Sequence, residues 1–204
     1  MKIIKQSHKI LTEINGRLIL KRIELCGRTC YKSEAGDFEK TKNFVKNIIN
    51  RGHESVLEHF NITVKFITDR GVTHELVRHR LASFSQESTR YCNYNDDKFG
   101  NELTFIEPVG MECTEMWEIA CADCEFFYNL MSDEGCTPEQ SRSVLPNSLK
   151  AEIVMTANLR EWRHILKLRT SKAAHPQIRD LMIHLLKELQ EKIPIIFDDI
   201  KEDK

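Results

Sequence analysis

The chain has 204 residues, with 30 Lys and Arg against 31 Asp and Glu and a formal net charge of −1. A chain of this length forms one domain or two small ones and can bury a sizeable core. Its near-neutral charge gives no bulk support to non-specific nucleic-acid binding, so recognition of an anion has to be local.

Cysteine usage and hydropathy indicate the compartment. Seven cysteines, an odd number, favour reduced thiols in a cytosol over a disulfide framework. Residues 1–16 alternate apolar and polar side chains and lack the continuous apolar stretch of a signal peptide. No segment approaches the ~20 apolar residues of a membrane span. We expect a soluble, cytoplasmic protein without membrane contact.

The first half of the chain predicts alternating elements. Residues 17–24 (RLILKRIE) mix aliphatic residues with charges and predict a strand, and residues 61–68 (NITVKFIT) predict another by their alternation. Residues 37–50 between them predict an amphipathic helix. Residues 71–82 predict a further helix with the triplet Arg78-His79-Arg80 near its end, so that Arg78 and Arg80 would point about 200° apart.

The second half predicts more elements of both kinds. These are strands at 102–106 and 152–157 and helices at 111–131, 159–168 and 176–192. The Gly-rich turn that opens a nucleotide-binding βαβ unit is missing. We therefore predict an α+β fold, a central and mainly antiparallel sheet flanked by helices with no Rossmann dinucleotide unit, as a single domain over residues 1–204.

A dense set of anion-binding side chains lies within Arg78–Arg90. Arg78-His79-Arg80 is followed after seven residues by Ser88-Thr89-Arg90. Guanidinium groups match phosphate oxygens bidentately, and a hydroxyl can complete the coordination. In an extended segment Ser88 and Arg90 would project to one side and could hold one phosphate. The alternative is an arginine-rich helix end and loop that simply face water.

The order of this segment resembles the signature of the flavin-dependent thymidylate synthases, RHR, seven residues, then S-x-R. Three other blocks resemble the same family in the same order. They are His53–His59 (HESVLEH, like H-E-x-x-x-E-H), Arg142–Pro146 (RSVLP, like R-x-x-L-P) and Asn158–Arg169 (like N-x-R-x-x-x-H/N…L-R). The resemblance covers most of the chain, from about residue 19 to about residue 192.

The resemblance implies reductive methylation of dUMP to dTMP, with 5,10-methylenetetrahydrofolate as carbon donor, FAD as hydride carrier and NADPH as reductant. It also implies a homotetramer with sites shared between subunits. Methylation at C5 needs electron density on that carbon, from a thiolate added at C6 or from stabilisation of the ring anion. The family is understood to use the second route, without an enzyme nucleophile, and Arg169 holds the position assigned to this catalytic role.

The resemblance also assigns binding residues. Expected dUMP contacts are Glu75, Arg78, Gln86, Ser88, Arg90, Arg142 and Arg169. Expected FAD contacts are His53, Ser55, Arg78, His79, Arg80, Gln86, Asn158, Arg160 and His164. Many members carry Gln in place of Glu75 and Asn in place of Ser85. Since a carboxylate cannot donate to a phosphate, Glu75 should face a ribose hydroxyl or an arginine.

Metal and thiol chemistry are weaker alternatives. His53 and His59 are six apart before a strand, which does not fit the helical metalloprotease pattern, and a polar turn is the plainer interpretation. Cys121 and Cys124 lie in an apolar helical run and are expected to pack as small hydrophobes. Cys92 follows Arg90-Tyr91, and nearby arginines would favour its thiolate, so Cys92 remains a candidate nucleophile. We expect no metal.

Two other classes of function remain open. The arginine cluster would also suit a phosphatase or nuclease, which usually needs a carboxylate-bound metal. An RNA-binding module could stack bases on Tyr91 and Tyr94 beside Arg80 and Arg90. The near-zero net charge argues against the RNA-binding module, and we expect no nucleic-acid partner.

Overall fold

The computed structural model describes residues 1–90, 94 and 102–202, and it divides into two compact units. Unit 1 comprises residues 1–7, 66–78 and 84–154, and unit 2 comprises residues 8–65, 79–83 and 155–204. The prediction of a single functional domain stays a prediction. None of the helices in the described part of the chain has the length and hydrophobicity needed to cross a bilayer.

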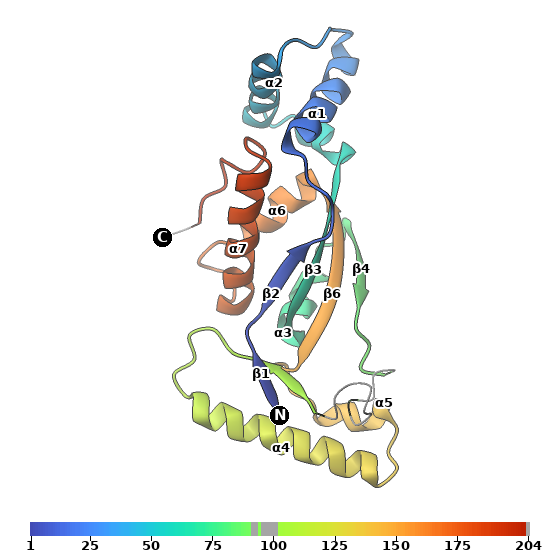
Figure 1. Ribbon diagram of the computed structural model, residues 1–204. Helices are drawn as coiled ribbons and strands as arrows, with labels where there is room; N and C mark the ends of the chain where they lie inside the picture. Colours follow the sequence, from blue (N-terminus) through green and yellow to red (C-terminus); the bar gives the residue numbers. More distant parts are fainter. Residues whose placement is uncertain (91–93, 95–101, 203–204) are drawn as a thin grey trace. The chain divides into compact units, whose positions relative to one another are not determined.

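The elements of each unit are shown in Figure 1. Unit 1 contains β1 (Lys2–Ile4), α3 (Arg70–Leu76), β5 (Thr104–Ile106), α4 (Thr114–Asp133), α5 (Pro138–Ser141) and the 3-10 helix η3 (Arg142–Val144). Unit 2 contains α1 (Gly16–Tyr31), α2 (Phe38–Asn50), the 3-10 helix η1 (Glu54–His59), α6 (Leu159–Arg169) and α7 (Pro176–Lys192). Strands β2 (Ser7–Ile10), β3 (Asn61–Asp69), β4 (Ala82–Gln86) and β6 (Lys150–Asn158) contribute residues to both units.

The strands form a four-stranded sheet in the order β2-β3-β6-β4 and a parallel pair of β1 with β5. The fold is α+β with an antiparallel sheet flanked by helices, as predicted. Burial alternates along β3 and β6, so one face of each strand is covered. The predicted strands at 61–68, 102–106 and 152–157 are confirmed as β3, β5 and β6.

The core of unit 1 gathers around α4 and contains Tyr94, Leu103, Phe105, Cys121, Tyr128 and Leu149. The sulfur of Cys121 lies 3.6 Å from the hydroxyl of Ser148. Burial raises the pKa of the Cys121 thiol and also that of Cys124. Cys121 therefore packs as a small hydrophobe in the core, as expected, whereas Cys124 is half-buried and lies outside this core.

In unit 2, two buried and consecutive residues of α6, Trp162 and Arg163, hold the helix in place. The indole of Trp162 donates to the carbonyl oxygen of Ile62 at 3.0 Å. The guanidinium of Arg163 is 1% exposed and binds the Glu54 carboxylate and both oxygens of Asp199. It also donates to the carbonyl oxygen of Ile196. This set of acceptors compensates the burial of the charge and anchors α6 to η1 and to the C-terminal segment.

The strand predicted at residues 17–24 is wrong, because this segment is the first half of α1. Asn15 caps the helix by accepting the N–H of Leu18. Ile19, Leu20 and Ile23 are buried while the residues between them face solvent. This spacing of three and four residues is helical, and the aliphatic composition obscured it.

The helix predicted at 71–82 ends early, at Leu76. The N–H of Arg78 bonds to the carbonyl of Glu75 at 3.3 Å, which closes a tight turn that ends at the first residue of the triplet. The last residue of the predicted helix, Ala82, instead begins β4, which runs to Gln86 and was not predicted. Arg78 and Arg80 are therefore not on a helix, and the opposed helical directions expected for them do not apply. The N-terminal strands β1 and β2 were also not predicted.

Candidate active site

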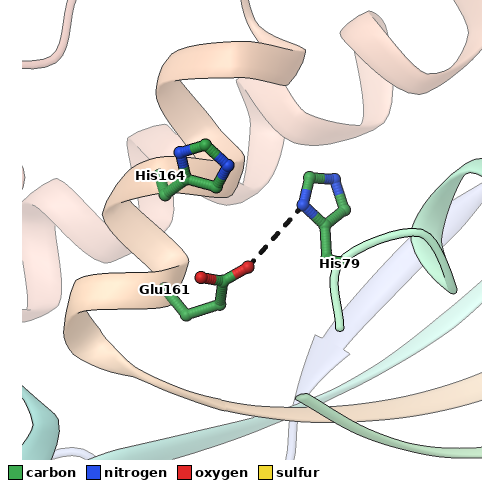
Figure 2. A group of neighbouring side chains, drawn as sticks. All are labelled: His79, Glu161 and His164. Carbon is green, nitrogen blue, oxygen red and sulfur yellow. Dashed lines mark ion pairs between the residues drawn. The ribbon is translucent and has the colours of Figure 1, made fainter. Parts of the chain in front are cut away.

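Helix α6 places most of the polar side chains of the candidate site. Asn158 caps the helix by accepting the N–H of Glu161 at 2.8 Å. Glu161 and His164 are three residues apart and share one face of the helix. Figure 2 shows both side chains beside His79, which comes from the segment between α3 and β4.

His79 is the centre of this group, which lies entirely within unit 2. The imidazole is 5% exposed, and its Nε2 accepts the Nε–H of Arg169 at 3.1 Å. Its Nδ1 lies 3.7 Å from Oε1 of Glu161, the contact dashed in Figure 2. The rings of His79 and His164 meet edge to face, with centroids 6.0 Å apart. The structure thus brings together His79, His164 and Arg169, all predicted, with Glu161, which was not.

His79 is neutral at neutral pH. Burial lowers its pKa to about 4, helped by the positive charge of Arg169 and by His164. A guanidinium only donates, so Nε2 of His79 carries the lone pair and Nδ1 carries the proton. The Nδ1–H faces the carboxylate of Glu161. At 3.7 Å this contact is longer than a direct hydrogen bond, and with a neutral imidazole it is a charge facing a dipole rather than a salt bridge.

The same three side chains have the composition of a metal site. Ligand atoms of His79, Glu161 and His164 lie within 4.8 Å of one another. A metal bound to Nδ1 of His79 would need a lone pair on that atom, but the hydrogen bond from Arg169 to Nε2 requires the proton of the neutral ring to be on Nδ1. The positive charge of the guanidinium beside the ring also repels a cation. The hydrogen bond therefore disfavours a metal. Within the described residues, His53 and His59 belong to no such group.

A second group of predicted residues lies within unit 1. Ser88 accepts the N–H of Arg90 at 3.3 Å, so the segment turns here. The extended geometry in which Ser88 and Arg90 would project to one side therefore does not apply. The Nε–H of Arg90 donates to Glu139 at 2.8 Å. Arg142 donates to the hydroxyl of Thr89 at 3.3 Å. The S-x-R segment and Arg142, predicted separately, are thus neighbours.

The pair of Arg90 with Glu139 is solvent-exposed, with side-chain exposures of 52% and 53%. Exposed ion pairs are worth about 0–1 kcal/mol. Such a pair exchanges readily for a stronger anion.

The other predicted nucleotide residues of unit 1 lie on α3 and β4. Glu75 is half-buried in the last turn of α3. The amide of Gln86, at the end of β4, donates to the hydroxyl of Thr73 at 3.1 Å. Arg78 is exposed in the turn after α3. The expectation that Glu75 faces a ribose or an arginine stays a prediction.

The predicted flavin residues of unit 2 outside this cluster lie near η1 and α6. His53 and Ser55 are exposed where η1 begins, and Arg80 is exposed before β4. Arg160 donates to Glu58 at 2.6 Å in an exposed pair. Because Glu54 binds Arg163, both carboxylates of the H-E-x-x-x-E-H block bind arginines of α6.

Sequence reasoning missed two acidic residues. Glu161 carried a signal, since it stands three residues after the capping Asn158 and three before His164. Glu139 carried none, because its partner Arg90 is 49 residues away. Tyr91 and Cys92 lie outside the described residues. Tyr94 is buried and donates to Glu87, so it offers no stacking surface to RNA bases.

Comparison with known proteins decides the family. The family described as thymidylate synthase complementing protein matches residues 19–195. The flavin-dependent thymidylate synthase of Geobacter sulfurreducens is 35% identical over 190 residues, covering 87% of this chain and 80% of its own. The probable flavin-dependent thymidylate synthase of Mycobacterium phage D29 is 35% identical over 191 residues, covering 87% and 81%. The chain belongs to the flavin-dependent thymidylate synthase family. The resemblance of the RHR…S-x-R signature is confirmed.

Solved structures agree on the fold of this flavin-dependent thymidylate synthase family member. The UMP/dUMP methylase PolB of Streptomyces cacaoi, bound with 5-Br dUMP, superimposes with a TM-score of 0.78 at 20% identity, covering 97% of this chain and 96% of the other. The same enzyme bound with 5-Br UMP gives 0.79, covering 97% and 95%. At this identity the likeness establishes the α+β fold and assigns no residue.

Proposed function

We propose that this chain reductively methylates dUMP to dTMP, with 5,10-methylenetetrahydrofolate as carbon donor, FAD as hydride carrier and NADPH as reductant. Family membership supports the reaction class, and PolB, a UMP/dUMP methylase, shares the fold. The observation that carries the proposal is the bond from Arg169 to neutral His79. The bond orients a permanently charged group, and the family resemblance assigns that residue to the pyrimidine.

Arg169 activates the ring electrostatically. Electron density reaches C5 when N3 of the pyrimidine loses its proton, and a guanidinium nearby stabilises that anion. Arg169 cannot take the proton itself at ordinary pH, so it is not the base. The half-buried position of the side chain strengthens the attraction, because less water screens the charge. No enzyme thiolate is required.

The nucleotide phosphate binds to Ser88, Arg90 and Arg142. A phosphate dianion offers Arg90 a stronger acceptor than the exposed Glu139 carboxylate does, and it can take the Ser88 hydroxyl as a further donor. The remaining nucleotide contacts are Glu75, Arg78, Gln86 and Arg169.

The donor set suits FAD. Arg78 and Arg80 are exposed, and within the described residues neither guanidinium has a hydrogen bond or ion pair, so both can serve a diphosphate. The other contacts are His53, Ser55, His79, Gln86, Asn158, Arg160 and His164. When bound, FAD supplies the hydride chemistry that no side chain offers. The side chains bind and orient it, and the proposal needs no metal.

The proposed assembly is a homotetramer in the cytoplasm, with sites shared between subunits. Helix α4 supports self-association because one face exposes a stripe of large apolar side chains, namely Met116, Ile119, Phe126, Phe127 and Leu130. Such a stripe is unfavourable in water and typical of a protein interface. Light scattering after size exclusion measures the mass, and a monomer would contradict the assembly.

The decisive experiment uses purified protein. It should show flavin absorbance as isolated or after reconstitution, bind dUMP, and release the C5 hydrogen of dUMP when NADPH and the folate are both present. Protein that cannot be loaded with FAD would overturn the proposal. Phosphate release that EDTA abolishes would indicate a phosphatase or nuclease instead.

A further inference from the structure

Glu161 is a carboxylate in an unfavourable place. The residue is 8% exposed on α6, and its backbone N–H is satisfied by the capping Asn158. Burying a carboxylate costs free energy unless a partner compensates it. The partner that its carboxylate faces is the Nδ1–H of His79. Neither the family signature nor the proposed binding sets include Glu161.

We infer that Glu161 is a positioning residue that holds His79 in the tautomer with its proton on Nδ1, so that Nε2 can accept from Arg169. The contact is a charge acting on the N–H dipole, which remains effective at 3.7 Å because the imidazole is shielded from water. The tautomer of a neutral histidine is set by the partners of its two nitrogens. Here a carboxylate lies on one side and a guanidinium on the other.

The tautomer matters because Arg169 cannot adapt to the other one. With the proton on Nε2, two N–H groups would face each other and the bond of 3.1 Å would be lost. The guanidinium would then keep its charge but lose its fixed orientation. The bond uses Nε and neither terminal nitrogen, so it orients the planar end of Arg169 without occupying it. The effect on catalysis rests on the proposed function, whereas the tautomer itself does not.

Three variants test the inference. Glu161→Ala removes the acceptor, and Glu161→Gln keeps an amide oxygen that can face Nδ1–H. Glu188→Gln is the matched control, because Glu188 pairs with Nε2 of His8 at 2.8 Å elsewhere in unit 2. Histidine side-chain ¹⁵N NMR identifies tautomers, and the His79 signal among the eight histidines is assigned by its loss in His79→Gln.

In the wild type and in Glu161→Gln we expect His79 with its proton on Nδ1. In Glu161→Ala we expect this tautomer to lose its dominance. The value of kcat/KM for dUMP should fall roughly tenfold in Glu161→Ala, because the hydrogen bond from the charged Arg169 to His79 is lost with the tautomer. It should recover in Glu161→Gln and stay unchanged in Glu188→Gln.

A wild-type spectrum with the proton on Nε2 would overturn the inference, even if Glu161→Ala fails to fold. An unchanged tautomer in folded Glu161→Ala would do the same. Stoichiometric binding of Zn²⁺ that removes the Nδ1 proton would also overturn the inference, since His79, Glu161 and His164 would then form a metal site. If the proposed reaction is wrong, all variants including the wild type lack turnover while the tautomer shift persists. The two failures are therefore distinguishable.

Discussion

Arg169 and His79 are 90 residues apart in sequence, yet the Nε–H of Arg169 bonds to Nε2 of His79 at 3.1 Å. The bond joins the last turn of α6 to the segment before β4. It is directional, since only the imidazole can accept. The position of the guanidinium therefore depends on the protonation of a histidine.

Replacing Arg169 with Ala should nearly abolish turnover while FAD stays bound. Loss of one charge-stabilising donor at a reacting group typically lowers kcat about 10²–10³-fold. Release of the C5 hydrogen of dUMP measures turnover, and flavin absorbance after gel filtration measures FAD. Arg17→Ala, at an exposed arginine of α1, is the control and should retain both. Near-normal turnover in Arg169→Ala would contradict ring activation by this residue.

Cys92→Ala should keep turnover within about twofold, because the proposed activation of the pyrimidine requires no nucleophile. The same hydrogen-release assay measures it. A loss comparable to that of Arg169→Ala would indicate a thiolate mechanism.

Glu139→Ala should tighten dUMP binding. In the unliganded chain Glu139 competes with the phosphate for Arg90, and an exposed ion pair of this kind is worth about 0–1 kcal/mol, or up to about fivefold in Kd. Calorimetric titration with dUMP measures the change. Glu118→Ala removes an exposed negative charge from α4 in the same unit and should leave the affinity unaltered. Weaker binding in Glu139→Ala would show that the pair organises the site.

His79 should make the protein less stable in mild acid. Its pKa is lowered to about 4 in the folded chain from 6.5, so between these values the unfolded chain binds the proton and the folded chain does not. The contribution of neutral His79 to the free energy of unfolding is fully present above pH 6.5 and is lost as the pH falls toward 4. The groups facing it are Arg169, His164 and Glu161.

Urea unfolding at pH 7 and at pH 5, in wild type and in His79→Gln, measures this effect. The loss of unfolding free energy between the two pH values should be smaller in His79→Gln. Equal losses would mean that His79 is not the group that titrates.

Arg163→Ala should destabilise the fold by about 3–5 kcal/mol, because it leaves the carboxylates of Glu54 and Asp199 without their shared buried cation. Urea unfolding measures the change. Asp199→Asn should cost less, since Asp199 is 42% exposed and Arg163 keeps Glu54. A cost below 1 kcal/mol for Arg163→Ala would contradict the anchoring role.

Local sequence patterns correctly predicted those helices and strands that are specified by residues within or next to the element itself. Helix α7 has the predicted bounds of 176–192 because Pro176 and Pro194 delimit a clear helical period. Residues 17–24 were misjudged because aliphatic side chains suit both strands and helices, and only burial against α2 and η1 distinguishes the two.

For the candidate site, too, one part was predictable from the sequence and another part was not. The family signature supplied His79, His164 and Arg169 as residue types, but not that they touch. The bonds of Arg169 to His79 and of Arg90 to Glu139 join residues 90 and 49 positions apart. Such contacts arise only when the chain folds, so no local pattern contains them. Whether the assigned residues bind their ligands stays a prediction.

Helix α6 serves two purposes within a few residues. Trp162 and Arg163 fasten it to its surroundings, while Glu161, His164 and Arg169 form the candidate site. In a library of random variants, substitutions throughout this segment would give inactive clones, some because the protein no longer folds and others because the site is damaged. A screen that measures both protein abundance and turnover for each clone is needed to separate mutations that destabilise the fold from those that impair catalysis.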